Sequence, residues 1–131
     1  MKLQTRFIIS VLLFFAIGAN AQPGSLVGGP QLSIDNPLHQ FGLMKQGSDI
    51  SCVFVVKNTG DQPLIISQCR ASCGCTTPKC DPTPIAPGAS TEIKVSYDSN
   101  RLGPFSKSIT IFWNSPDGST NDIVITGDVQ P

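Results

Sequence analysis

The residues with the clearest capacity for chemistry in this sequence are its cysteines. There are five of them, and four lie in one short stretch. The four clustered residues are Cys69, Cys73, Cys75 and Cys80. Thiols placed this closely can form disulfides, hold a soft metal ion or exchange electrons with another dithiol. The spacing leaves these three chemistries open.

Two structural disulfides are the simplest interpretation of the cluster, because exported proteins usually oxidise such thiols, and four cysteines allow three pairings. A copper or zinc site is the second interpretation, although zinc sites normally offer two separated C-x2-C pairs. The third is a redox-active pair of Cys73 and Cys75, which flank Gly74. In an extended chain their Cα atoms would lie about 6.5–7 Å apart, near the upper limit for a disulfide. Such a bond would be strained and easily reduced.

The fifth cysteine, Cys52, alternates along the chain with Phe54 and Val56. Side chains two residues apart point to the same face of a strand. We therefore predict that Cys52 is a buried free thiol, which acts as a small apolar residue of the core.

The rest of the sequence shows no catalytic arrangement. His39 is the only histidine, and no nucleophile elbow accompanies it. Glu92 is the only glutamate, so a carboxylate pair for glycoside hydrolysis would need aspartates from turns. We predict no enzymatic activity, and no cofactor apart from the copper or zinc ion of the second interpretation.

The segments that must hold the cysteines have the pattern of β-strands. Ile93, Val95 and Tyr97 alternate with polar residues, which is typical of a half-buried strand. Seven strands are expected: Leu32–Asp35, His39–Gly42, Asp49–Lys57, Pro63–Cys69, Thr91–Tyr97, Phe105–Trp113 and Asp122–Val129. Turn sequences rich in Pro, Gly, Asn and Asp separate them. The pattern predicts an all-β, immunoglobulin-like seven-stranded β-sandwich over residues 32–131, with a small barrel as the alternative.

The N-terminal segment predicts export. Lys2 and Arg6 precede an apolar run of about 13 residues, which is too short to span a membrane, and Ala19-Asn20-Ala21 has the small-x-small pattern of a cleavage site. We expect residues 1–21 to be a cleaved signal peptide and residues 22–31, rich in Gly and Pro, to be a flexible leader. The mature chain is expected to be periplasmic or extracellular, without membrane insertion.

The charges of the mature chain exclude two classes of partner. Of nine Lys and Arg, Lys2 and Arg6 lie in the signal peptide, which leaves seven against nine Asp and Glu. The seven are scattered, so they form no basic stripe that could follow a row of phosphates. Neither nucleic acid nor an anionic membrane surface is therefore an expected partner.

The sequence resembles the exported bacterial domain-of-unknown-function family 1573, which is related to Hydin-type and PapD-like immunoglobulin sandwiches. The residues that carry the resemblance are Phe54, Asn58-Thr59-Gly60, Pro63-Leu64-Ile65-Ile66, Ser72-Cys73-Gly74-Cys75-Thr76, Pro84-Ile85-Ala86-Pro87-Gly88, Gly103, Asn114 and Ile125-Thr126-Gly127. It covers roughly Asp35 to Val129. The resemblance implies a seven-stranded sandwich outside the inner membrane, but it does not imply an activity. Cys69 and Cys80 are additional to the family motif, which favours a disulfide pairing particular to this chain; they could also complete a metal site.

Taken together, these features favour a non-enzymatic interaction or structural module of the cell envelope. Edge strands of a sandwich carry unpaired backbone groups, to which an extended segment of a protein partner could add. A cysteine-based copper or zinc protein is the alternative, followed by a thiol–disulfide redox protein.

Overall fold

The alternating apolar residues form eight β-strands in a computed structural model that describes residues 28–131. The strands are β1 (Leu32–Ile34), β2 (Leu38–Lys45), β3 (Ile50–Asn58), β4 (Ile66–Ala71), β5 (Thr76–Lys79), β6 (Ser90–Tyr97), β7 (Gly103–Trp113) and β8 (Asn121–Gln130). The expected signal peptide, and residues 22–27 of the expected leader, lie outside the described residues. Between residues 28 and 131, no helix is long and apolar enough to cross a membrane.

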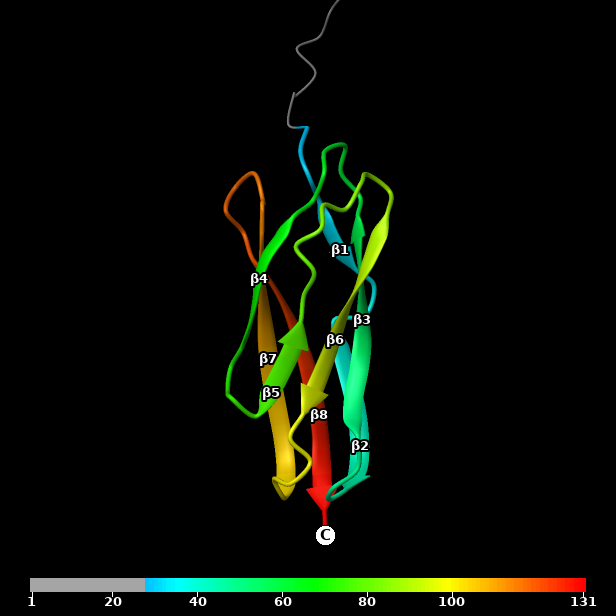
Figure 1. Cartoon of the computed structure of the whole chain (residues 1–131), viewed down its shortest axis with the longest axis vertical. Coiled ribbons are helices and arrows are strands. Elements are labelled where there is room, and N and C mark those ends of the chain that lie inside the picture. Colours follow the sequence, from blue (N-terminus) through cyan, green and yellow to red (C-terminus); the bar gives the residue numbers. More distant parts are fainter. Residues whose placement is uncertain (1–27) are drawn as a thin grey trace, which may run out of the picture.

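The strands form two four-stranded sheets that pack face to face (Figure 1). The first sheet has the order β1-β3-β6-β5 and the second has the order β2-β8-β7-β4. Neighbours are antiparallel except β2, which runs parallel to β8. The prediction of an all-β, immunoglobulin-like sandwich is confirmed.

The apolar core lies between the sheets, on the faces that the alternation predicted. Ile93 and Val95 of β6 are fully buried, as are Ile109 and Ile111 of β7. Trp113 of β7 packs against the core but is only partly buried, and its ring N–H donates a hydrogen bond to Oδ1 of Asn121 at 2.8 Å. This bond satisfies the one polar group of the indole at the margin of the core.

The prediction of seven strands is wrong by one, because Thr76–Lys79 forms the additional strand β5. The segment is short and contains Pro78, which lacks the N–H that a central strand needs. It is tolerated here because β5 is an edge strand that pairs only with β6. The cysteine loop that precedes β5 shows no alternation of apolar and polar residues, so the strand could not be predicted from the sequence.

The chain changes sheets between β1 and β2. β1 pairs with residues 56–58 of β3, and after Ile34 the chain crosses to the second sheet. Pro37 has no N–H to donate, whereas its carbonyl accepts a hydrogen bond from the Val124 N–H of β8 at 2.8 Å. Because β1 is so short, residues 50–55 of β3 pair with β6 on one side and, in the part of the chain that the structure describes, have no strand on the other.

Residues 28–31, assigned from the sequence to a flexible leader, are held against the β3–β4 connection. The Gly29 N–H donates to Oδ1 of Asp61 at 2.6 Å, and the Thr59 N–H donates to the Gln31 carbonyl at 2.9 Å. The fully buried Asn58 side chain joins this contact: its amide donates to the carbonyls of Gln62 and Ile85, and Oδ1 accepts from the N–H groups of Gly60 and Gln31. A buried amide with every group paired fixes the entry of the chain into β1.

At the opposite end of the sandwich, a glycine makes room for an aromatic ring. The Phe105 ring stacks on Tyr97 with centroids 3.7 Å apart. The same ring passes over Gly127, where an added Cβ would stand 2.7 Å from Cζ of Phe105 and 3.2 Å from Cβ of Phe41. Gly127 is therefore required by close packing rather than by its backbone conformation.

We expect Gly127→Ala to lower the free energy of unfolding by about 1–3 kcal/mol, because the new methyl group displaces the buried Phe105 ring. Urea denaturation followed by circular dichroism measures the loss. Gly74→Ala is the matched control, since nothing lies within 4 Å of its Cβ and its φ is not positive. Equal losses in the two variants would contradict this account of Gly127.

Candidate functional site

One margin of the sandwich is closed by a disulfide. Cys69 lies on β4, the edge strand of the second sheet, and Cys80 directly follows β5, the edge strand of the first. The two are joined by a disulfide with their Cα atoms 6.2 Å apart. The bond therefore links the two sheets on the side where both edges would otherwise separate.

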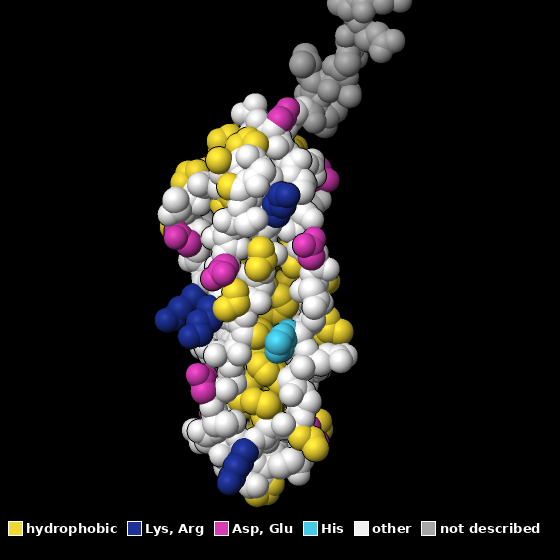
Figure 2. Space-filling model, turned by 90° about the vertical axis from the view of Figure 1, so that its right-hand side faces the viewer, with side chains coloured by type: hydrophobic (Ala, Val, Ile, Leu, Met, Phe, Trp, Pro, Cys, Tyr) yellow, Lys and Arg dark blue, Asp and Glu magenta, His cyan; other side chains and the backbone are white. Residues whose placement is uncertain are grey.

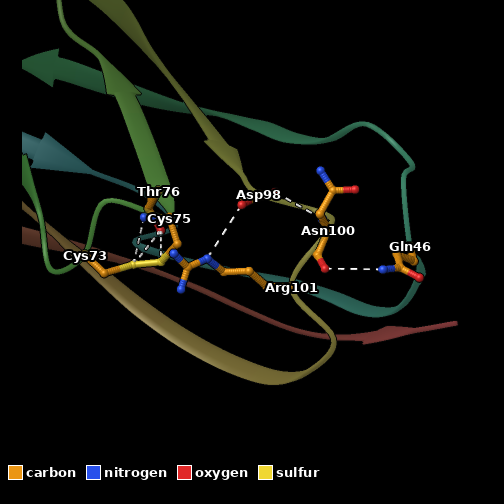
Figure 3. Close-up of polar contacts among 7 residues, drawn as sticks. All are labelled: Gln46, Cys73, Cys75, Thr76, Asp98, Asn100 and Arg101. Atoms are coloured by element: carbon orange, nitrogen blue, oxygen red, sulfur yellow. Dashed lines mark hydrogen bonds and ion pairs between the residues drawn. A yellow bond between two sulfur atoms is a disulfide. The ribbon is translucent and has the colours of Figure 1, made fainter.

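A second disulfide joins Cys73 and Cys75 in the loop that the first one encloses, with 5.3 Å between their Cα atoms. The Cys75 N–H donates a hydrogen bond to Sγ of Cys73 at 3.2 Å, and Oγ1 of Thr76 lies 3.9 Å from Sγ of Cys73 and 3.7 Å from Sγ of Cys75 (Figure 3). The Cys75 carbonyl accepts from the Asp98 N–H at 2.8 Å. The Thr76 hydroxyl thus lies near both sulfurs, and the Cys75 N–H is bonded to that of Cys73.

The two bonds differ in what they can add to stability. Cys69 and Cys80 are separated by 11 positions, whereas Cys73 and Cys75 are separated by 2. The entropy of loop closure gives about 3 kcal/mol for a loop of the first size and only about 1.5 kcal/mol for the second. The larger loop also spans two sheets, so the Cys69–Cys80 bond has the structural role and the Cys73–Cys75 bond has little of it.

The fifth cysteine, Cys52, is unpaired and only partly buried, so the prediction of a buried thiol overstated its burial. It packs against the core from β3 at the point where that strand has no neighbour on one side. The partial burial disfavours the thiolate and raises the pKa of Cys52 from 9.0 to about 11. The thiol is therefore neutral, and poorly nucleophilic, near pH 7.

The four clustered cysteines are paired in disulfides, so they present no thiolates to a metal ion. Across residues 28–131, no group of three or more His, Cys, Asp or Glu side chains is arranged to hold a metal ion. His39 packs instead among aromatic rings, with its centroid 4.5 Å from that of Phe41 and 6.5 Å from that of Phe54.

The opposite margin of the sandwich is open and apolar. We call it the seam, and it is formed by Leu38, His39, Val53, Phe54 and Val55. Together with Asp35 and Asn36, these residues line a hollow of about 220 Å³ where β2 and β3 pass each other. Figure 2 shows this side of the molecule, with the histidine lying in a stripe of hydrophobic side chains that runs between polar borders.

The seam exposes more apolar surface than the interior of a strand normally does. Val53 is 49% exposed and Val55 is 53% exposed, on the face of β3 that points away from the core. Asp35 is the one charged residue that lines the hollow. The hollow is thus lined by apolar side chains and one negative charge, and the exposed Lys94 and Glu92 of β6 lie next to Val53 and Val55 on the same face of the sheet.

The backbone beside the seam also has free hydrogen-bonding groups. Among residues 28–131, residues 50–55 of β3 have β6 on one side and no strand on the other. In such an edge strand every second residue directs its N–H and C=O groups outward. An extended chain laid along the seam could therefore both bury Val53 and Val55 and pair with β3.

The seam was not predicted from the sequence, although residues 52–56 carry a signal for it. Residues 52–56 read Cys-Val-Phe-Val-Val, a continuous apolar run in place of strict alternation. Such runs are typical of strands covered on both faces. In this fold only one face of β3 is covered by the second sheet.

The sequence matches the model of one protein family, and solved structures share its fold. The family described as "Protein of unknown function (DUF1573)" matches residues 32–129. None of the curated proteins matches the sequence. Among solved structures, a protein of unknown function from Porphyromonas gingivalis W83 superposes with a TM-score of 0.68 at 18% identity, over 83% of this chain and 51% of that chain.

Two further structures define the kind of sandwich. PapD-like domain 7 of human CEP192 has a TM-score of 0.67 at 8% identity, over 96% of this chain and 98% of that one. The Vibrio cholerae VesB protease has a TM-score of 0.63 at 19% identity, over 75% of this chain but only 32% of the protease chain. This chain therefore spans about half of the Porphyromonas protein and a smaller part of the protease. At these identities the likeness shows the fold alone.

We expect the two disulfides to contribute unequally to stability. The variant Cys69→Ala/Cys80→Ala should lose about 3 kcal/mol of unfolding free energy, because the edges of both sheets are released. The variant Cys73→Ala/Cys75→Ala should lose about 1.5 kcal/mol. Urea denaturation of the oxidised proteins compares them. A larger loss in the second variant would refute the structural assignment of the first bond.

The thiol of Cys52 should make stability depend on alkaline pH. Its folded-state pKa of about 11 exceeds the value of 9.0 for a free thiol, so the folded protein holds this proton more tightly. Its contribution is present below pH 9 and is lost as the pH rises toward about 11. The difference in unfolding free energy between the native chain and Cys52→Ala should therefore change over that window. A constant difference would contradict the shift.

Proposed function

This chain belongs to the DUF1573 family, and from that premise we propose that it is an exported, non-enzymatic module of the cell envelope that binds an extended segment of a partner protein along the seam. The observation that carries the proposal is the coincidence of exposed Val53 and Val55 with the unpaired edge of β3. An added strand would cover the two exposed valines and pair with the backbone edge of β3 at the same time.

The contrast between the two margins supports this assignment. At the margin of β4 and β5, the Cys69–Cys80 bond and Pro78 limit pairing with another chain. The seam has no such protection along residues 50–55 of β3. Proteins usually guard exposed apolar edge strands against association, so an unguarded one on a folded domain favours a specific partner.

The lining of the seam defines the chemistry of that partner. Its apolar residues favour a segment that alternates apolar and polar side chains, because only every second side chain of an added strand faces the seam. Asp35, the charged residue at the hollow, favours a Lys or Arg near the corresponding end of the segment. A proline within the segment would remove a hydrogen bond to β3.

Export and the lack of enzymatic activity are supported by separate features. Two disulfides in a chain of this size fit an oxidising compartment, as does the signal-like segment of residues 1–21. His39, the one histidine, packs against Phe41 and Phe54 at the seam, so it is part of an apolar surface and is poorly placed to transfer a proton.

The test is a selection of displayed random peptides on the oxidised protein. We expect enriched peptides that alternate apolar and polar residues, lack internal proline and carry Lys or Arg. Synthetic copies should protect amides of residues 50–55 from hydrogen exchange. Val53→Lys should weaken their binding at least about tenfold, because a charge would enter the apolar contact.

Leu102→Lys is the matched control, since Leu102 is 56% exposed and lies outside the seam; it should leave the affinity unchanged. Three results would each refute the proposal: no enrichment, protection of amides on another strand, or equal binding by Val53→Lys. Circular dichroism of both variants confirms that the fold is retained.

A further inference from the structure

The Cys73–Cys75 disulfide contributes little to the stability of the fold. It encloses one residue, Gly74, and sits within the loop already bounded by the Cys69–Cys80 bond. We propose that it is a redox-active disulfide that accepts two electrons from a dithiol of another exported protein. This inference rests on the export that the proposed function includes but not on binding at the seam, because the cysteine loop lies between β4 and β5 whereas the seam lies between β2 and β3.

The enclosing bond makes such a reaction compatible with the fold. When the inner disulfide opens, Cys69 and Cys80 still hold the ends of the loop, and β5 still pairs with β6 through residues 76–79. The Asp98 N–H also continues to bind the carbonyl of Cys75. The inner bond can therefore break and form again while the two sheets stay linked.

The two sulfurs differ in access, which sets the direction of attack. Cys73 is half-buried and is followed by the exposed Gly74, with nothing within 4 Å of the Cβ position there. Cys75 is buried in the core with 4% exposure. An incoming thiolate therefore reaches Sγ of Cys73, and Cys75 is the leaving group.

The surrounding hydrogen-bond donors suit both steps. In the first step the partner thiolate bonds to Sγ of Cys73, the inner disulfide breaks, and Cys75 leaves as a thiolate beside the hydroxyl of Thr76. In the second step the other thiolate of the partner attacks its own sulfur in the mixed disulfide. Cys73 then leaves as a thiolate that the Cys75 N–H already faces at 3.2 Å. Donors to a thiolate stabilise it and speed its departure.

The balance is complete with the dithiol as the only co-reactant. Two electrons and two protons pass to Cys73 and Cys75, which become thiols, and the partner gains one disulfide. The reverse reaction, with an oxidised acceptor, regenerates the bond. Thr76 is a positioning residue in both directions, because its hydroxyl lies near both sulfurs.

The first test needs no variant. The oxidised protein is equilibrated in glutathione buffers of decreasing potential, the free thiols are alkylated, and the sites are identified by mass spectrometry. We expect Cys73 and Cys75 to be labelled in buffers that leave Cys69 and Cys80 oxidised. Reduction of both bonds together, or of Cys69–Cys80 first, would overturn the proposal.

The second test identifies the accessible sulfur with a synthetic peptide that carries an activated disulfide. In Cys75→Ala the free Cys73 thiol should displace the activating thiol and form a mixed disulfide with the peptide at least about tenfold faster than Cys75 does in Cys73→Ala. Thr76→Val, which keeps the shape but removes the hydroxyl, should slow exchange between the oxidised protein and a dithiol peptide several-fold. Equal trapping in the two cysteine variants, with circular dichroism showing both folded, would refute the assigned attack at Cys73.

Discussion

The passage of the chain from one sheet to the other after Ile34 is the constraint on which the open margin depends. β1 covers only residues 56–58 of β3, and Pro37 directs the next strand to β8. Had β1 continued along β3, residues 50–55 would have been paired and Val53 and Val55 would have stood beside a neighbouring strand. The short first strand therefore creates the unpaired edge and the hollow next to it.

The entry of the chain into β1 is in turn fixed by buried polar groups. Asn58 has no exposed surface, and its side chain joins the carbonyls of Gln62 and Ile85 to the amides of Gly60 and Gln31. Each of these groups would be unsatisfied without the others. The register in which β1 meets the end of β3 follows from this one amide.

The sequence was sufficient to predict the sandwich, because successive side chains of a half-buried strand point to the core and to solvent in turn, and apolar and polar residues alternate accordingly. Ile93 and Val95 were placed on one face of a half-buried strand by spacing alone, and they are fully buried. Features that depend on tertiary contacts could not be found this way. β5 contains a proline that only an edge position permits, and residues 28–31 resemble a linker until Asp61 and Asn58 bind them. The continuous apolar run of β3 was visible, but its meaning required knowledge of which face lacks a covering layer.

The two margins of the sandwich differ because one is closed by a disulfide and the other is not. A sandwich of this size has four edge strands, and each carries unpaired backbone groups. At β4 and β5 the Cys69–Cys80 bond fixes the distance between the sheets, so the loop it encloses can change its own bonding without moving them. At β2 and β3 no bond crosses the margin within the described chain, so the surface remains available to another backbone. The margin closed by the Cys69–Cys80 bond permits redox chemistry in its loop, whereas the open margin at β2 and β3 permits association with another chain. The domain can hold both sites because its eight strands place the two margins on opposite sides of the sandwich.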